Sequence, residues 1–408
     1  MAVGDGELGT IYPVKGFRLG VASAGIKKPG RKDLVVMALA EGSHIAAVFT
    51  RNAFCAAPVQ LAKTYLASAQ AEGLAIRYLV TNTGNANAGT GAVGLADATA
   101  VCQRVAEITG VRVCQVLPFS TGVIGEALPT QKIAEALPAA VSALSEQAWL
   151  DAALGIMTTD TRPKAASRQI IVAGTTVTIS GITKGAGMIK PNMATMLAYL
   201  ATDAYIEPAQ LQSILTDAVN ASFNRITIDG DTSTNDSAVL VATGASGVVL
   251  QRADDVAQFR LALESLCVEL AQAIVKDGEG ATRFVSVMVS GGASDDECLN
   301  VAYTVAESPL VKTALFASDP NWGRILAAIG RARVPELKVD GVTLWLDDVL
   351  IAEQGGRAAS YREEDGQRVM AQPEFAIKID LGRGTCAQTV WTTDLSHDYI
   401  RINAEYRS

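Results

Sequence analysis

The stretch from Lys184 to Leu197 has the sequence KGAGMIKPNMATML and differs in texture from the rest of the chain. A glycine-rich turn with two lysines leads into an apolar run that contains few polar side chains. Thr195 interrupts this run between Ala194 and Met196. Periodicity alone favours a strand residue whose hydroxyl bonds the backbone, because β-branched residues suit strands. A catalytic hydroxyl at this position needs support from other parts of the sequence.

The segments around this stretch alternate between strand-like and helix-like patterns. Apolar runs at 34–39 and 45–49 flank Glu41-Gly42 and predict a β-hairpin. Residues 254–276 carry apolar side chains at spacings of three and four and are followed by Gly278. This pattern predicts a long amphipathic helix that ends at a glycine. Strands and helices of this kind indicate a mixed α/β protein.

The sequence changes character after Gly280, where shorter helical segments mix with alternating strands. Asp340-Gly341 predicts a second hairpin, because such a pair tolerates the positive φ angles of a tight turn. The polar–apolar alternation of residues 399–408 predicts a terminal strand. We therefore expect a main domain over about 1–280 and a smaller α+β domain over about 281–408.

Composition and charge exclude several classes of protein. The chain has 408 residues, of which 49% are hydrophobic and 19% charged, as in an ordinary globular enzyme. Lys and Arg number 34 against 42 Asp and Glu, so the net charge is 34 − 42 = −8, and no basic field exists to hold a nucleic acid. No signal peptide and no run of about 18 apolar residues is present. These features predict a soluble cytoplasmic protein with no membrane partner.

Histidine and cysteine are too few or too scattered for the familiar catalytic and metal motifs. The only histidines are His44 and His397, and they provide neither an H-E-x-x-H motif nor a recognisable Ser-His-Asp triad, which would need one of them as base. The six cysteines contain no C-x-x-C pair, which argues against structural zinc and a disulfide framework. We expect reduced thiols and no bound metal.

Two further motifs have simpler interpretations. Residues 89–94 match G-x-G-x-x-G between a strand and a helix, but several residues separate the strand from the first glycine, unlike the dinucleotide fingerprint. A turn loop is the favoured interpretation, with a nucleotide site as the alternative. Residues 229–236 (DGDTSTND) are acidic but lack the glycine and glutamate that a calcium loop requires. They predict a hydrogen-bonded turn.

The segment 184–197 resembles the signature around the self-cleavage point of the ornithine acetyltransferase (glutamate N-acetyltransferase) family of arginine biosynthesis. The resemblance spans the chain, and one departure is Gly89, where the family pattern leads us to expect cysteine. The other matching segments are LPFSTGVIG at 117–125, MTTDT at 157–161, KDGEGAT at 276–282, SDPNWGR at 318–324 and YIRINAEYRS at 399–408.

The resemblance implies a fold and a processing event. The fold is expected to consist of layered helices and mixed β-sheets of the aminopeptidase-like N-terminal-nucleophile type, with a smaller C-terminal domain. The precursor of this family cuts itself before a threonine, here between Ala194 and Thr195. Residues 1–194 and 195–408 are then the α and β chains of one folded unit. A heterotetramer of two α and two β chains is expected.

The resemblance also implies the chemistry. Thr195 would act as nucleophile, and its new α-amino group, with an ordinary pKa of about 7.7–8.0, would act as base, so that no histidine is required. Its hydroxyl would take the acetyl group of N2-acetylornithine and pass it to glutamate in a ping-pong reaction. Thr121 and Gly122 would form the oxyanion hole. The implied substrate-binding residues are Thr158, Lys184 (for a carboxylate), Thr195, Glu279 (for an ammonium group), Asn403 and Ser408.

Three alternatives stay open. An N-terminal-nucleophile amidase or aminopeptidase would release the acyl group to water instead of glutamate. An NAD-dependent dehydrogenase would use residues 89–94, and a non-catalytic amino-acid-binding protein would use only the pocket. No cofactor is expected, although acetyl-CoA is open as a second acetyl donor. Feedback inhibition, the extent of cleavage and the role of Lys190 are not predicted.

Overall fold

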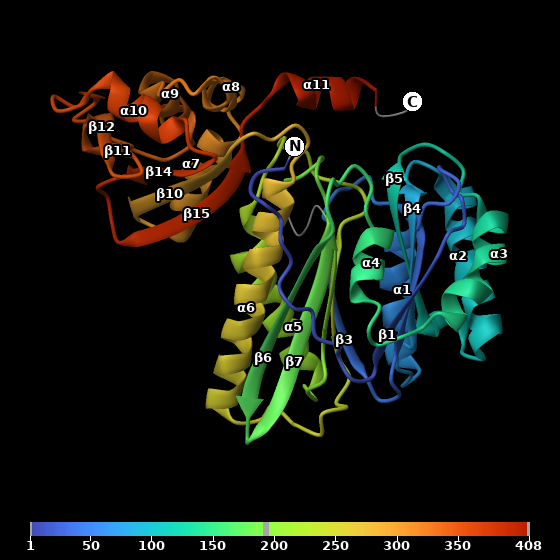
Figure 1. Ribbon diagram of the computed structural model, residues 1–408. Coiled ribbons are helices and arrows are strands. Elements are labelled where there is room, and N and C mark those ends of the chain that lie inside the picture. Colours follow the sequence, from blue (N-terminus) through green and yellow to red (C-terminus); the bar gives the residue numbers. More distant parts are fainter. Residues whose placement is uncertain (1, 191–195, 406–408) are drawn as a thin grey trace.

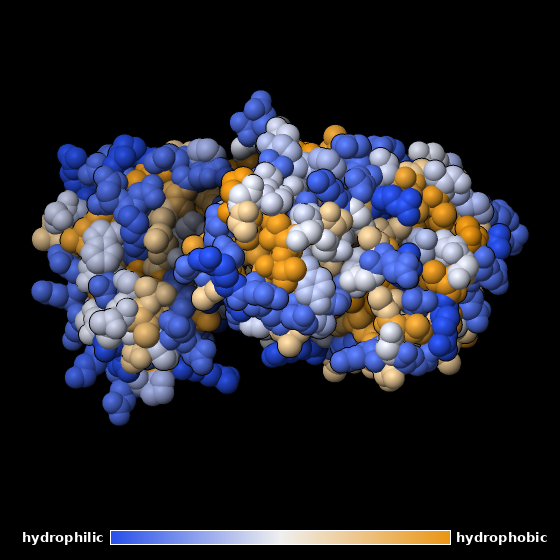
Figure 2. Space-filling view, turned by 90° about the horizontal axis from the view of Figure 1, so that it is seen from below, coloured by the Kyte–Doolittle hydropathy of each residue, from blue (hydrophilic) through white to orange (hydrophobic). Residues whose placement is uncertain are grey.

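The computed structural model describes residues 2–190 and 196–405. Its strands form three mixed sheets, two in a large first unit and one in a smaller unit with its own helices (Figure 1). The mixed α/β class predicted from the sequence is confirmed. No helix in the described part of the chain is long and apolar enough to cross a membrane. Figure 2 shows a face on which apolar side chains form separate patches among polar ones.

The first sheet has four strands in the order β1-β2-β4-β5. The β4–β5 pair is parallel and the other pairs are antiparallel. Helices α2 and α3 cover its outer face (Figure 1). The bounds are β1 Phe17–Ala22, β2 Leu34–Leu39, β4 Tyr78–Asn85, β5 Val116–Val123, α1 Ala57–Ala71, α2 Gly91–Thr109, η1 Val113–Gln115, α3 Thr130–Ser142 and α4 Trp149–Gly155.

The second sheet has five strands in the order β3-β9-β8-β7-β6, with β8 and β9 parallel. Since β2 and β3 lie in different sheets, the hairpin predicted over 34–49 is wrong. The turn at Glu41-Gly42 carries the chain from one sheet to the other, where β3 pairs with β9. The bounds are β3 His44–Phe49, β6 Lys164–Val172, β7 Thr175–Lys184, β8 Leu197–Thr202, α5 Pro208–Ala221, η2 Phe223–Arg225, β9 Ser237–Ala242 and α6 Ala253–Lys276.

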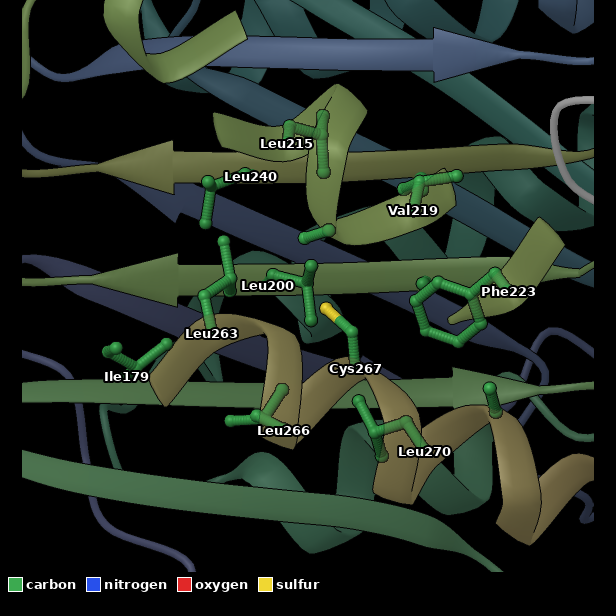
Figure 3. Close-up of a cluster of buried hydrophobic side chains, with 14 of the residues drawn as sticks. Ile179, Leu200, Leu215, Val219, Phe223, Leu240, Leu263, Leu266, Cys267 and Leu270 are labelled. Carbon is green, nitrogen blue, oxygen red and sulfur yellow. The ribbon is translucent and has the colours of Figure 1, made fainter. Parts of the chain in front are cut away.

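These two sheets pack face to face, and helices cover their outer faces. Along β9, Val239 and Val241 point into the cluster between the sheets, whereas Ala238 and Leu240 point into a second cluster beneath α5 and α6. Figure 3 shows Leu240 there beside side chains of both helices. Strands β8 and β9, each six residues long, are buried at every position, because one face of each strand meets the first sheet and the other meets the helices. Helix α6 confirms the amphipathic helix predicted over 254–276.

The third sheet has the order β13-β12-β11-β14-β10-β15, and α7 to α10 cover one of its faces. The hairpin predicted at Asp340-Gly341 is wrong, because these residues form a 3-10 turn and β11 begins only at Thr343. The bounds are β10 Phe284–Gly292, α7 Asp295–Ala306, α8 Pro309–Ala317, α9 Trp322–Arg331, η3 Val339–Gly341, β11 Thr343–Leu346, β12 Val349–Glu353, β13 Gly356–Arg357, α10 Glu363–Met370, β14 Glu374–Asp380 and β15 Cys386–Thr393.

The last element is helix α11, His397–Ala404, where the sequence predicts a strand. Ser396 caps this helix by accepting a hydrogen bond from the Tyr399 amide, which starts helical turns in a segment with strand-like alternation. The Ser396 hydroxyl also donates to the Gly280 carbonyl at 2.6 Å. Helix α11 leaves the third sheet and extends towards the first unit (Figure 1).

Candidate active site

A cavity of about 280 Å³ lies where the first two sheets meet α11. It is lined by six of the residues that the resemblance implies for catalysis or substrate binding, namely Thr121, Gly122, Thr158, Lys184, Glu279 and Asn403. The remaining three, Ala194, Thr195 and Ser408, lie outside the described residues. Met196, which follows Thr195 in the sequence, also lines the cavity. The structure thus brings together side chains that are as much as 282 positions apart (403 − 121).

The end of strand β5 forms one wall of the cavity. Thr121 and Gly122 lie there, paired with Thr83 and Gly84 of the parallel strand β4. Gly122 has a φ of +136°, and a Cβ atom placed on it would lie 2.3 Å from the carbonyl carbon of Gly84. Only glycine fits this position. The close approach of β4 and β5 therefore fixes the position of the Gly122 backbone in the cavity wall.

Lys184 ends strand β7 and is only 8% exposed. Its Nζ donates a hydrogen bond to the Thr121 hydroxyl at 3.3 Å. Burial lowers the pKa of Lys184 below its ordinary value, although the negative charge of Asp160 acts in the opposite direction. The cavity therefore holds a largely desolvated amine, which favours an anionic ligand group beside it.

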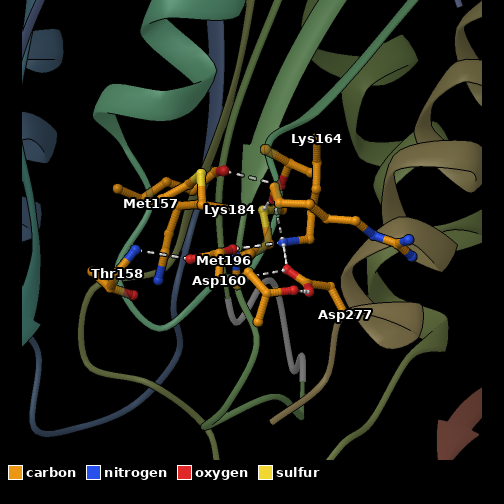
Figure 4. A network of polar contacts seen from close by, with 12 residues as sticks. Met157, Thr158, Asp160, Lys164, Lys184, Met196 and Asp277 are labelled. Carbon is orange, nitrogen blue, oxygen red and sulfur yellow. Dashed lines mark hydrogen bonds and ion pairs between the residues drawn. The ribbon is translucent and has the colours of Figure 1, made fainter. Parts of the chain in front are cut away.

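A buried ionic cluster of Asp160, Lys164 and Asp277 lies behind Lys184 (Figure 4). Lys164 Nζ lies 2.7 Å from Asp160 Oδ1 and 2.6 Å from Asp277 Oδ2, and all three side chains are almost fully buried. Burial by itself raises the pKa of Asp160, but Lys164, Lys184 and the hydrogen bonds to its carboxylate outweigh this effect and lower the pKa. The carboxylate of Asp160 is thus stabilised in its charged form.

Asp160 connects the loop that carries Thr158 to the end of strand β7, where Lys184 lies. Its Oδ2 accepts the Thr158 amide at 2.9 Å and its Oδ1 accepts the Gly185 amide at 2.7 Å. In the sequence, Asp160 belongs to the matching segment 157–161, from which no role for it is predicted. No spacing pattern identifies it, because Gly185 lies 25 positions away and comes near only through pairing of β6 with β7.

Glu279 and Asn403 form a second polar part of the cavity wall. Asn403 Nδ2 donates to Glu279 Oε2 at 2.8 Å, so α11 contributes directly to the cavity. The Glu279 amide donates to the Ala186 carbonyl at 2.8 Å. A Cβ atom on Gly187 would lie 2.5 Å from Glu279 Oε2, which explains a glycine there. Glu279 is 9% exposed, unlike an ordinary solvated surface charge.

Residues 229–236 form a hydrogen-bonded turn, as predicted, and this turn also contacts the segment beside the cavity. Asp229 accepts the backbone amides of Met188 and Ile189 at 2.6 and 2.9 Å. This turn also supplies Asp236, which is buried in the cavity wall and was not predicted as a site residue. Within the described residues, Asp236 Oδ2 has no hydrogen-bond partner, and burial raises its pKa well above the ordinary value. This carboxyl group is therefore poised to meet a hydrogen-bond donor in the cavity.

The glycines at 89–94 are explained by local packing. Asn87 Nδ2 donates to the Gly94 carbonyl, and the Thr90 hydroxyl donates to Asn87 Oδ1, both at 2.8 Å. A Cβ atom on Gly94 would lie 1.8 Å from Thr90 Oγ1. The turn-loop interpretation therefore holds only for Gly89 and Thr90, because residues 91–94 form the first turn of helix α2.

Residues 2–190 and 196–405 contain neither a cluster of metal-ligating side chains nor a disulfide bond. No group of three His, Cys, Asp or Glu residues in these ranges could hold a metal ion. All six cysteines are free thiols, four of them buried.

Comparison with known proteins gives matches along the whole chain. The ArgJ family model matches residues 18–408. The arginine biosynthesis bifunctional protein ArgJ of Pseudomonas fluorescens is 60% identical over 411 residues, and that of Pseudomonas syringae pv. tomato is 58% identical over 417 residues, with full coverage of both chains in each case. A crystal structure of the protein of the same name from Bacillus halodurans is 38% identical and covers 52% of this chain and 99% of its own, with a TM-score of 0.49.

A mixed α/β fold, a cavity with paired cationic and anionic side chains, and full-length biosynthetic relatives together define an enzyme. The chain belongs to the ArgJ family. This membership confirms the family resemblance stated from the segments around 184–197. The roles of the individual site residues remain predictions.

Proposed function

We propose that this protein is a glutamate N-acetyltransferase that moves the acetyl group of N2-acetyl-L-ornithine to L-glutamate. The observation that carries the proposal is that buried Lys184 and buried Glu279 line one cavity together with Thr121 and Gly122. An α-amino-acid derivative has a carboxylate and carries amino groups, so such a cavity complements it in charge. The relatives' names place those proteins in arginine biosynthesis.

We assign the substrate contacts by charge. Lys184 binds the α-carboxylate, and Glu279 binds an ammonium group while Asn403 holds its carboxylate in place. Thr158 supplies a hydrogen bond from a loop fixed by Asp160. Thr121 and the Gly122 amide stabilise the oxyanion, and each such donor typically lowers the barrier by about 2.7–4 kcal/mol.

Thr195 is the proposed nucleophile, supported by the position of Met196, the next residue, in the cavity wall. Cleavage after Ala194 frees the α-amino group of Thr195, which accepts the proton of its hydroxyl as Oγ attacks the acetyl carbon. The proton then passes to the departing amine of ornithine. The amine of glutamate attacks the resulting acetyl ester, loses a proton to the α-amino group and regenerates the hydroxyl.

Acetyl-CoA is a second possible donor for the same acetyl-threonine intermediate. Its thioester can acetylate the free hydroxyl of Thr195, and the CoA thiol is then released. The description of the relatives as bifunctional supports this proposal. We further propose the heterotetramer of two α and two β chains and a cytoplasmic location, both of which rest on the family.

One assay tests the proposed function. Purified protein is incubated with acetylornithine and glutamate, with and without acetyl-CoA, and ornithine, N-acetylglutamate and free acetate are quantified. Equal amounts of ornithine and N-acetylglutamate are expected. Release of acetate without transfer to glutamate would instead favour the amidase alternative.

A further inference from the structure

A second cavity, of about 310 Å³, adjoins the proposed active site. It shares four lining residues with the first cavity, namely Gly122, Val123, Thr158 and Thr159. A reactant whose acetyl or amino group lies at Thr121 and Gly122 is therefore close to this space. We call this second cavity the basic pocket because of the charged residues described next.

Cationic side chains outnumber anionic ones in the basic pocket. Its charged lining residues are Lys27, Lys28, Arg31, Arg401, Asp33 and Glu405, which sum to a net charge of 4 − 2 = +2. The carboxylate of Asp33 accepts the amides of Ala24 and Ile26 at 2.6 and 2.7 Å, which disperses its negative charge. The whole chain carries −8, so this pocket is a local exception. Such a pocket attracts anions.

The cations reach the pocket from segments far apart in the sequence. Arg31 Nη2 donates to the carbonyls of Met157 and Thr158 at 2.7 and 3.0 Å, so its guanidinium is held against the substrate loop. Arg401 comes from α11, where it forms an exposed ion pair with Asp398. Lys28 is exposed at the rim. Hydrogen bonds to carbonyls leave the positive charge of Arg31 available to an anion.

We propose that the basic pocket binds an anionic group of a reactant that acetylornithine lacks. This inference rests on the proposed function. Acetylornithine has one carboxylate and a side-chain ammonium group, whereas glutamate carries a second carboxylate and acetyl-CoA carries phosphates. The shared chemistry is a cluster of anionic oxygens, from either source, at a fixed distance from the acetyl group. The negative charge of Glu279 repels an additional anionic group, whereas the net positive charge of the basic pocket attracts it.

The test removes exposed cations that line the basic pocket but not the first cavity. The double variant Lys27→Gln/Lys28→Gln and the single variant Arg401→Gln are compared with Arg333→Gln/Lys338→Gln, which removes two exposed charges from the C-terminal unit. Steady-state kinetics are measured separately for acetylornithine, glutamate and acetyl-CoA. We expect KM to rise about tenfold for glutamate or for acetyl-CoA, with kcat within about twofold, in the pocket variants only.

The two sources are distinguished by the substrate affected: a rise for glutamate identifies the second carboxylate, and a rise for acetyl-CoA identifies the phosphates. Unchanged KM values for both overturn the proposal. Equal rises that include acetylornithine also overturn it, because they indicate general damage. Circular dichroism checks folding of each variant. If the unmodified protein transfers no acetyl group, the proposed function fails, which is a separate result.

Discussion

At the scale of single residues, Gly122 makes the clearest structural demand. Alanine there would place its Cβ 2.3 Å from the Gly84 carbonyl carbon and would have to adopt a φ of +136°. We expect Gly122→Ala to lower the free energy of unfolding by about 1–3 kcal/mol and kcat by at least about tenfold, because β4 and β5 must separate. Urea unfolding and acetyl-transfer rates measure the two effects.

Gly125→Ala is the matched control for this prediction. Gly125 also has a positive φ, +84°, but no atom lies within 4 Å of its added Cβ. This variant should cost only the conformational strain of about 1–2 kcal/mol and keep most of the activity. Equal loss of activity in both variants would contradict the role assigned to the close approach of the strands.

Lys184 allows a second test at this scale. Lys184→Ala removes the buried amine that lies 3.3 Å from the Thr121 hydroxyl. If it binds the substrate carboxylate, KM for acetylornithine should rise by about tenfold or more, since a charge-assisted hydrogen bond is lost. An unchanged kcat/KM would remove Lys184 from the substrate site.

At the scale of elements, the ionic cluster ties together the strands and the helix that surround the cavity. Lys164 on β6 pairs with Asp277 at the end of α6 and with Asp160 before β6. Lys164→Met keeps much of the side-chain volume but leaves two buried carboxylates without their cation. We expect the free energy of unfolding to fall by about 3–5 kcal/mol in urea titrations. A loss below about 1 kcal/mol, as for a surface pair, would contradict this account.

The same cluster predicts a pH dependence. The pKa of Asp160 is lower in the folded protein than the value of about 3.9 expected in the unfolded chain. Its ionised form therefore stabilises the fold fully above that value, and this contribution is lost as the pH falls through the folded pKa. The difference in free energy of unfolding between the protein and Asp160→Asn should be largest near pH 6 and shrink below about pH 4. A difference that grows on acidification would contradict the assignment.

Elements with a strong internal pattern were predictable, and those decided by distant partners were not. The apolar spacing of 254–276 is visible in the sequence and matches α6. The runs at 34–39 and 45–49 are strands, but their pairing depends on β9, nearly 200 positions away, so the expected hairpin failed. The terminal segment became α11 because of the cap at Ser396, which alternation alone did not reveal.

At the scale of the whole molecule, the site exists only where separate segments converge. Strand β5, the loop before β6, the end of β7, the turn after α6 and helix α11 each contribute to the cavity. Composition and periodicity could not place these segments together. The family resemblance supplied Thr121, Thr158, Lys184, Glu279 and Asn403. It did not supply Asp160 or Asp236, whose importance follows from burial and contacts.

The central claim is that a hydroxyl made reactive by chain cleavage carries the acetyl group. The most direct test is mass spectrometry of the purified protein after brief incubation with acetylornithine alone. We predict a fragment that begins at Thr195 and bears one acetyl group, together with released ornithine, whereas Thr195→Ala stays a single unacetylated polypeptide. An unbroken chain that still transfers acetyl groups to glutamate would contradict the account.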